Sequence, residues 1–199
     1  GGCRMWKYTD EQAAVRDVLR LSRGMTFKAA VAGLKLGGGK AVIMADSHTE
    51  KTPEMLKAFA RAVESLQGKY ITAEDVGMTV GDIDTMRGIT KYAVGGSNEG
   101  GSGDPSGMTA FGVFQGMKAA YKFAGLGESL EGVKVAIQGV GNVGYHLASY
   151  LSAAGAKLII TDIYPGQVEK VEQEFGAEIV APDQIYSVNC DIFAPCALG

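Results

Sequence analysis

The sequence predicts an α/β protein made of two lobes, which span residues 1–95 and 96–199. Helical and strand patterns lie on both sides of the segment Gly95–Gly103, in which five of nine residues are glycine, as is typical of a linker or hinge. After residue 130 short apolar strands alternate regularly with amphipathic helices, which indicates a parallel sheet covered by helices.

The first lobe carries both helix and strand signals. The segment Thr9–Gln12 is typical of a capping box, so we expect a helix that begins there and runs to Gly24 or beyond. Two more helices are expected after Thr52, which is followed by a proline at the first helical position, and after Thr79. Apolar runs predict strands at residues 40–44, 69–72 and 92–94.

The second lobe begins with a turn at Asp104–Ser106 that opens a helix. Beyond it, Val143, Leu147 and Leu151 recur every four residues and mark a second helix, and a polar helix is expected near residues 167–175. Strands are expected at residues 133–137, 158–161, 178–180 and 191–194.

The composition narrows the function classes. Glycine supplies 29 of 199 residues, about twice its usual share, and only 5 prolines and no G-X-Y period accompany it, which excludes collagen. The net charge of −3 argues against nucleic-acid binding, and no apolar run is long enough to cross a membrane. The 3 cysteines and 2 histidines show no metal-ligand spacing. We therefore expect a cytoplasmic protein with free thiols and no metal, nucleic-acid partner or membrane segment.

A G-x-G-x-x-G motif lies between an expected strand and an expected helix, which is the setting of a Rossmann dinucleotide-binding domain. The first glycine permits a tight turn, the second lets the backbone approach a pyrophosphate, and the third lets the helix pack on the strand. Asp162 ends the next strand, where an acid binds the ribose hydroxyls and repels a 2′-phosphate, which favours NAD over NADP. The expected NAD contacts here are Gly139, Val140, Gly141, Asn142, Val143, Gly144, Tyr145 and Asp162. The alternatives are an unrelated glycine turn and a methyltransferase-like nucleoside site.

Lys40 follows three glycines and opens an expected strand. Ala41 stands where a phosphate-binding loop requires a hydroxyl, so the motif is not a nucleoside-triphosphate site. A lysine that is partly desolvated in such a place loses its proton more readily and can act as a general base, although a surface lysine is the alternative. Asp75 comes just after a strand, where site residues of α/β proteins often lie, but it could equally cap a turn.

Six segments, spread over nearly the whole chain, together resemble the amino-acid dehydrogenases of the glutamate, leucine, phenylalanine and valine family. In chain order they are Gly1–Trp6, Leu19–Lys28, Leu36–Lys40, Ile71–Gly77, Gln138–Gly144 and Asp191–Gly199. Several such motifs in the correct order are far more specific than any one of them.

The resemblance implies roles for matching residues. Lys40 matches the catalytic lysine that activates water, Asp75 the catalytic aspartate that exchanges protons with the amino group, and Lys28 the lysine that pairs with the substrate α-carboxylate. The family also places backbone beside the substrate at Gly1 and Gly2, and residues near the nicotinamide or its ribose at Ser106, Thr109, Cys196, Ala197 and Leu198. It further implies a homo-oligomer, from dimer to octamer.

The resemblance leaves the substrate less sharply defined. Ala73 and Glu74 before Asp75 resemble leucine-type members, and the methyl group of Ala73 would narrow the substrate pocket toward leucine, valine and isoleucine. The segments Gly1–Cys3 and Gly100–Pro105 look closer to phenylalanine- and valine-type members, which remain the alternative. No second cation is evident for a glutamate side chain.

The family has chain before Gly1 and a long segment after Gly199, so the resemblance implies an incomplete substrate-binding lobe (residues 1–95) and a truncated Rossmann lobe (residues 96–199). A non-catalytic NAD-binding fragment and an unrelated NAD-linked reductase are the competing interpretations. The presence of Lys28, Lys40 and Asp75 together argues against both.

Overall fold

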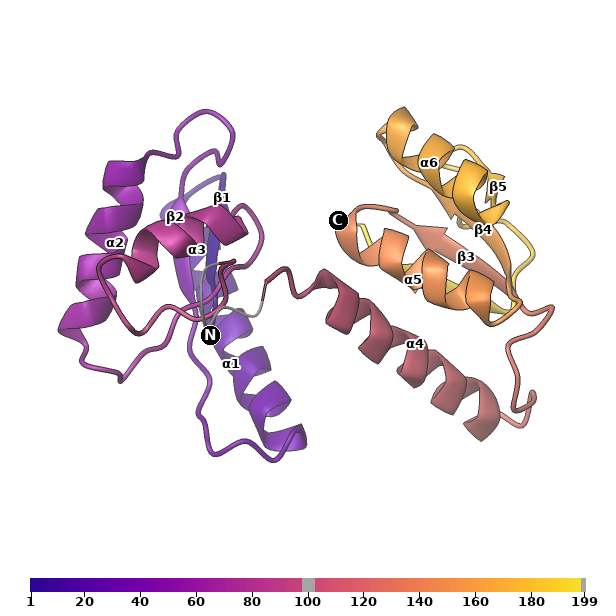
Figure 1. Ribbon diagram of the computed structural model, residues 1–199, viewed down its shortest axis with the longest axis horizontal. Helices are drawn as coiled ribbons and strands as arrows, with labels where there is room; N and C mark the ends of the chain where they lie inside the picture. The colour runs from indigo at the N-terminus through magenta and orange to yellow at the C-terminus, as the bar shows by residue number, and fades with distance from the viewer. Residues whose placement is uncertain (98–102, 198–199) are drawn as a thin grey trace. The chain divides into compact units, whose positions relative to one another are not determined.

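The computed structural model describes residues 1–97 and 103–197, and the chain forms two compact units, Gly1–Asp104 and Pro105–Gly199 (Figure 1). The boundary lies at the end of the glycine-rich segment, whereas the sequence placed it at the start. The Gly103 amide donates to the Gly96 carbonyl over 2.9 Å, so both flanks of the segment belong to the first unit. Residues 98–102, at the middle of the expected hinge, lie outside the described residues.

The first unit is built around a strand that the sequence did not predict. This strand, β1 (Cys3–Trp6), pairs in parallel with β2 (Ala41–Met44), with Cys3 opposite Ala41. On its other side Cys3 bridges Glu74, and Thr72 in turn bridges Ala93, so the strands expected at 69–72 and 92–94 are reduced to single bridges. The unit is therefore α/β with parallel pairing, and β1 lies at its centre.

The helices of the first unit begin largely where capping residues predicted. Thr52 caps α2 (Pro53–Ser65), and Thr79 forms a reciprocal capping box with Asp82 at the start of α3 (Val80–Arg87). The first helix, α1 (Glu11–Val31), is capped by Asp10 rather than by Thr9, since the Asp10 carboxylate accepts from the Ala13 amide over 2.8 Å. It runs beyond Gly24, as the sequence allowed, and this places Lys28 in its last turn.

The core of the first unit lies between β1 and the two later helices. It is made of apolar side chains with little or no exposure, namely Met5, Ala45, Leu56, Ala60, Met78, Ile83, Met86 and Ala93. By contrast, α1 buries only Ala14 and Ala29. Most of the hydrophobic stabilisation of this unit therefore comes from α2, α3 and β1.

The second unit has the regular alternation that the sequence predicted. Its elements are α4 (Ser106–Phe123), β3 (Lys134–Gln138), α5 (Asn142–Ala153), β4 (Lys157–Thr161), α6 (Pro165–Phe175), β5 (Glu178–Ile179) and β6 (Ile192–Pro195). The strands form one parallel sheet in the order β5-β4-β3-β6. Because the chain runs outward from β3 in both directions, the carboxyl ends of β3 and β6 flank a topological switch point, where α/β proteins bind ligands.

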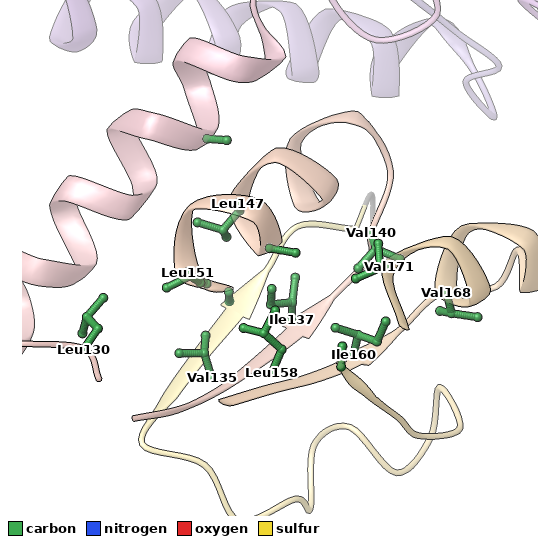
Figure 2. Close-up of a cluster of buried hydrophobic side chains, with 14 of the residues drawn as sticks. Leu130, Val135, Ile137, Val140, Leu147, Leu151, Leu158, Ile160, Val168 and Val171 are labelled. Carbon is green, nitrogen blue, oxygen red and sulfur yellow. The ribbon is translucent and has the colours of Figure 1, made fainter. Parts of the chain in front are cut away.

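The central strands of this sheet are buried on both faces. Leu147 and Leu151 of α5 and Val168 and Val171 of α6 pack with side chains from one face of β3 and β4 (Figure 2). On the opposite face Ala136 and Ile159 meet Ile185. A strand that is covered on both faces appears in the sequence as a continuous apolar run. This explains why the strand ends predicted from the sequence agree with the observed ends to within about one residue.

Two further features bear on the function classes considered above. No helix in residues 1–97 or 103–197 is long and apolar enough to cross a membrane. Cys3, Cys190 and Cys196 are free cysteines.

The turn after Asp75 gives a stability prediction. Gly77 has a φ of +79°, and a side chain there would collide with the Met5 carbonyl of β1. Gly77→Ala should therefore lower the free energy of unfolding by about 1–3 kcal/mol, measured by chemical denaturation. Gly81→Ala is the matched control, because its Cβ would meet only Thr79 Oγ1, at 3.8 Å. It should leave stability unchanged or slightly raised, and equal losses in the two variants would contradict this account.

Candidate functional site

The first unit brings Lys40 and Asp75 together. Lys40 directly precedes β2, Asp75 follows Glu74, and both neighbouring segments pair with Cys3 of β1. As a result Lys40 Nζ lies 2.9 Å from Asp75 Oδ2, in an ion pair whose side chains are only 7% and 22% exposed. Two residues 35 positions apart in the sequence thus form one shielded polar centre.

A second cation, which the sequence analysis did not identify, contacts the same carboxylate. Arg4 Nε donates to Asp75 Oδ2 over 3.0 Å, and Arg4 Nη1 donates to Asp17 Oδ2 of α1 over 3.2 Å. The hydroxyl of Tyr8 donates to the same Asp17 oxygen over 2.6 Å. The sequence could have indicated that Arg4 lies here only if β1 had been recognised as a central strand. That was not possible, because β1 has four residues, which are too few to show a strand pattern.

These contacts fix the charge of Asp75. Burial acts to raise the pKa of Asp75, but the hydrogen bond and charge of Lys40, the charge of Arg4 and the Val76 amide outweigh it. The net effect holds the pKa of Asp75 below its ordinary value, so the group is a carboxylate at neutral pH. In this state Asp75 can accept a hydrogen bond from, and stabilise, a cationic nitrogen.

Glycine backbone lies directly beside the pair. A Cβ at Gly2 would come within 2.8 Å of the Glu74 carbonyl and 3.2 Å of Asp75 Cβ, and a side chain at Gly1 would collide with Gly39. The hydroxyl of Tyr70 donates to the Gly2 carbonyl over 3.0 Å. Burial raises the pKa of Tyr70 and of the Cys3 thiol to about 12 each, so both groups are neutral near the ion pair.

Two further residues, Lys28 and Ala73, were expected to bind the substrate, and their side chains do not contact the Lys40–Asp75 ion pair. Lys28 is exposed in the last turn of α1, and its side chain makes no hydrogen bond or ion pair with the described residues. Ala73 contributes its carbonyl, which accepts from the Cys3 amide over 2.9 Å and thereby helps to hold β1 beside Asp75.

In the second unit the G-x-G-x-x-G loop connects β3 to α5 at the switch point. Gly139 has a φ of +88°, and a Cβ there would lie 2.6 Å from the Ala197 amide nitrogen. A side chain at Gly144 would collide with the Gly139 carbonyl. No described atom lies within 4 Å of a Cβ position at Gly141, the N-cap of α5. The first and third glycines thus serve packing, while the second faces open space.

The start of α5 has the properties of an anion site. No side chain of the described residues caps this helix, so its first amides can bind an external acceptor such as a phosphate. Val140 is fully buried and anchors the loop in the core, and Asn142 and Val143 form the first turn. The residues present therefore fit a dinucleotide pyrophosphate.

Asp162 and the segment after β6 border this loop. Asp162 follows β4 and accepts the Val140 amide over 2.8 Å and the Tyr164 amide over 3.0 Å, one on each carboxylate oxygen. The Cys196 amide donates to the Gln138 carbonyl over 2.7 Å, and burial raises the pKa of the Cys196 thiol. Ala197 lies against Gly139, as noted, and Leu198 lies outside the described residues.

The remaining expected cofactor residues are placed on helices of the same unit. Tyr145 follows the third glycine, but its hydroxyl donates to Glu174 of α6 over 2.6 Å and Lys170 lies over its ring, so its side chain is committed to α6. Ser106 is buried at the first residue of α4, and Thr109 is exposed one turn later.

Two family models match the chain. Residues 1–92 match the model described as Glu/Leu/Phe/Val dehydrogenase, dimerisation domain, and residues 100–166 match the model described as Glutamate/Leucine/Phenylalanine/Valine dehydrogenase.

Curated proteins align with the chain over its full length. It is 56% identical to a leucine dehydrogenase of Geobacillus stearothermophilus and 48% identical to an L-tryptophan dehydrogenase of Nostoc punctiforme. These alignments cover 100% of this chain but 54% and 56% of the two relatives, so the chain spans about half the length of the curated relatives it matches.

Solved structures give the same picture of the fold. The crystal structure of L-tryptophan dehydrogenase from Nostoc punctiforme matches 100% of this chain and 56% of its own, with 45% identity and a TM-score of 0.73. The hetero-hexameric glutamate dehydrogenase from Thermus thermophilus matches 99% of this chain and 53% of its own, with a TM-score of 0.72. Its identity of 22% supports the fold alone.

Proposed function

Because the chain belongs to the Glu/Leu/Phe/Val dehydrogenase family, we propose that the protein catalyses the NAD-dependent, reversible oxidative deamination of branched-chain L-amino acids to 2-oxo acids and ammonia. The observation that carries the proposal is the shielded Lys40–Asp75 ion pair, bordered by the glycine backbone of residues 1 and 2. A fully solvated pair of surface charges would have no comparable chemical use.

The roles of the first unit follow from the charges of an amino acid. Lys28 pairs with the α-carboxylate, and its exposure leaves it available to do so. Asp75 accepts a hydrogen bond from the α-amino group and moves protons on and off that nitrogen. The backbone of Gly1 and Gly2 is proposed to lie beside the substrate near Asp75, and Ala73 to narrow the side-chain pocket.

Lys40 assists the addition of water to the imine of the substrate by accepting a proton from that water. Lys40 must first give up its own proton. A substrate ammonium beside Asp75 would be the third cation at this carboxylate, after Lys40 and Arg4, and this crowding of positive charge favours that loss. Asp75 then delivers a proton to the nitrogen of the resulting carbinolamine. Ammonia leaves as the C–N bond breaks, the hydroxyl proton passes to the Asp75 carboxylate, and the 2-oxo acid remains.

The second unit is proposed as a Rossmann domain that holds NAD. The amides at the start of α5 and the open approach at Gly141 would bind the pyrophosphate, and Asp162 would bind the adenosine ribose hydroxyls. Each Asp162 oxygen accepts one backbone amide and retains a further acceptor position for a hydroxyl. Ser106, Thr109, Cys196, Ala197 and Leu198 are proposed near the nicotinamide half. NAD supplies, when bound, the acceptor for the hydride that leaves the substrate Cα.

The preference for branched aliphatic substrates rests on Ala73 and on the relatives. Identity to the leucine dehydrogenase of Geobacillus stearothermophilus is 56%, against 46% to a valine dehydrogenase of Streptomyces virginiae and 48% to the tryptophan enzyme. Aromatic substrates and a strict valine preference are therefore the alternatives within the family.

Self-association is proposed for the first unit, which matches a dimerisation domain. The apolar residues Val15, Leu19, Phe27 and Val31 lie at multiples of four along α1 and are all exposed. The outer edge of β2 is also without a neighbouring strand among the described residues. An apolar ridge and a free strand edge together fit a second copy of the chain better than solvent.

The activity is tested by initial rates of NAD reduction with the full-length enzyme and a panel of L-leucine, valine, isoleucine, phenylalanine, tryptophan and glutamate. The branched-chain substrates should give the highest kcat/KM, and NAD should bind more tightly than NADP. Lys40→Ala should lower kcat by about 10²–10⁴-fold, the usual contribution of a general base. Lys28→Ala should act mainly by raising KM for the amino acid.

Lys35→Ala is the control for these variants, because Lys35 is an exposed lysine of the segment that connects α1 to β2. Its kinetics should match those of the wild type. Normal turnover in Lys40→Ala would refute the proposed mechanism, and tighter binding of NADP would refute the proposed role of Asp162.

Oligomer formation is tested by sedimentation velocity of the full-length protein. We expect one defined oligomer, and Leu19→Glu together with Val31→Glu should shift it to smaller species because charges on the ridge oppose burial. A wild-type protein that sediments as a monomer would contradict the proposed interface.

A further inference from the structure

Arg4 joins two carboxylates that come from different elements of the first unit. Its Nε contacts Asp75 and its Nη1 contacts Asp17 of α1, while the Tyr8 hydroxyl holds Asp17 from the other side. The Arg4 side chain is about one quarter exposed, so water competes little for these bonds. The guanidinium therefore links α1 to the proposed catalytic pair through β1.

The arrangement is specific at the level of single oxygen atoms. Lys40 Nζ and Arg4 Nε both contact Oδ2 of Asp75, at 2.9 and 3.0 Å. Two charged donors on one oxygen restrain the carboxylate plane and leave the other oxygen to accept from a further donor.

We propose that Arg4 is a positioning residue for the dehydrogenase reaction, which holds Asp75 so that Oδ1 is presented to the substrate nitrogen while Lys40 remains beside Oδ2. The inference rests on the proposed function, because it assigns Asp75 a role toward an amino group. Arg4 acts through Asp75 and is not itself a catalytic residue. Asp17, which also accepts from the Tyr8 hydroxyl, holds the outer end of the guanidinium, so the guanidinium cannot swing away when Lys40 moves its proton.

The groups that surround Asp75 define its electrostatic setting. The charged ones are Lys40 before β2 and Arg4 on β1, with Asp17 beyond Arg4 and Glu74 adjacent in the chain. Cys3, Tyr8 and Tyr70 are neutral, because burial raises the pKa of each of them. Burial itself acts to raise the pKa of Asp75, and the cations outweigh it. Loss of Arg4 therefore moves the pKa of Asp75 upward.

A lysine could supply the charge of Arg4 but not its geometry. Guanidinium presents several donors in a rigid plane, so one side chain can reach two carboxylates, whereas an ammonium is a single point on a flexible stem. The conservative variant thus separates charge from position.

The experiment compares Arg4→Met, Arg4→Lys and Asp17→Asn in the full-length enzyme. Arg4→Met should lower kcat by about 10–100-fold with the KM for NAD unchanged, because a misplaced group costs rate rather than cofactor binding. The acid limb of its pH profile should move to higher pH, since Asp75 is protonated more easily with one cation fewer. Arg4→Lys should return the acid limb of the pH profile to its wild-type position but recover only part of the lost kcat. Asp17→Asn should lower kcat less than Arg4→Met does, and it should not move the acid limb to higher pH.

Arg16→Met is the matched control, because Arg16 is an exposed arginine of α1 next to Asp17 in the sequence, and its removal subtracts the same charge. Its kcat and pH profile should equal those of the wild type. The proposal is overturned if Arg4→Lys retains full kcat. It is also overturned if Arg4→Met loses only thermal stability while the folded enzyme keeps the wild-type kcat and acid limb.

A measurement without turnover separates this proposal from the proposed function. The Tm of the Asp17→Asn variant is compared with that of the double variant Asp17→Asn/Arg4→Met. The difference between these two Tm values should narrow as pH falls. The reason is that a carboxylate whose pKa is lowered by folding contributes its full stabilisation above its ordinary pKa of about 4. That stabilisation is lost as pH falls from there through the lowered pKa of the folded protein. A constant gap would overturn the Arg4–Asp75 coupling, whereas an inactive wild type with a narrowing gap would overturn only the proposed reaction.

Discussion

The burial of the Asp75 carboxylate between two cations is the constraint on which the first unit depends. A charged group removed from water is tolerated only if it is paired and hydrogen-bonded, and Asp75 receives Lys40, Arg4 and a backbone amide. These partners come from three separate segments that meet only because β1 pairs on both sides. The same pairing requires glycine at positions 1 and 2, where a side chain would collide with neighbouring backbone.

The second unit meets a comparable demand for close backbone approach by a different route. Its sheet is held by apolar side chains on both faces, and Val140 of the loop after β3 is part of that core. Gly139 and Gly144 let the loop after β3 pack against α5 and the segment after β6, and this packing leaves the start of α5 open at Gly141. Close backbone approach thus explains the glycines at these positions, whereas others, such as Gly24 and Gly107, have no atom within 4 Å of a Cβ position.

Local signals in the sequence predicted local structure well and long-range contacts poorly. Thr52 and Thr79 marked helix starts, and β3 and β4 of the second unit were recognisable because burial on both faces leaves continuous apolar runs. The strand β1 has only four residues, and its identity comes from its partners rather than from its own pattern. Arg4 and Asp17 were missed for the same reason, since nothing in a sequence pattern shows that β1 and α1 converge on Asp75. Lys40 and Asp75 were identified, but not that they touch.

The central claim is that Lys40 and Asp75 act as one catalytic unit. A double-mutant cycle on kcat for L-leucine oxidation by the full-length enzyme tests it most directly, with Lys40→Ala, Asp75→Asn and the double variant compared. Groups that work as a unit give strongly non-additive losses, so the double variant should be about as slow as the slower single variant. Losses in the double variant that equal the product of the two single losses would show that the residues act independently and would contradict the account.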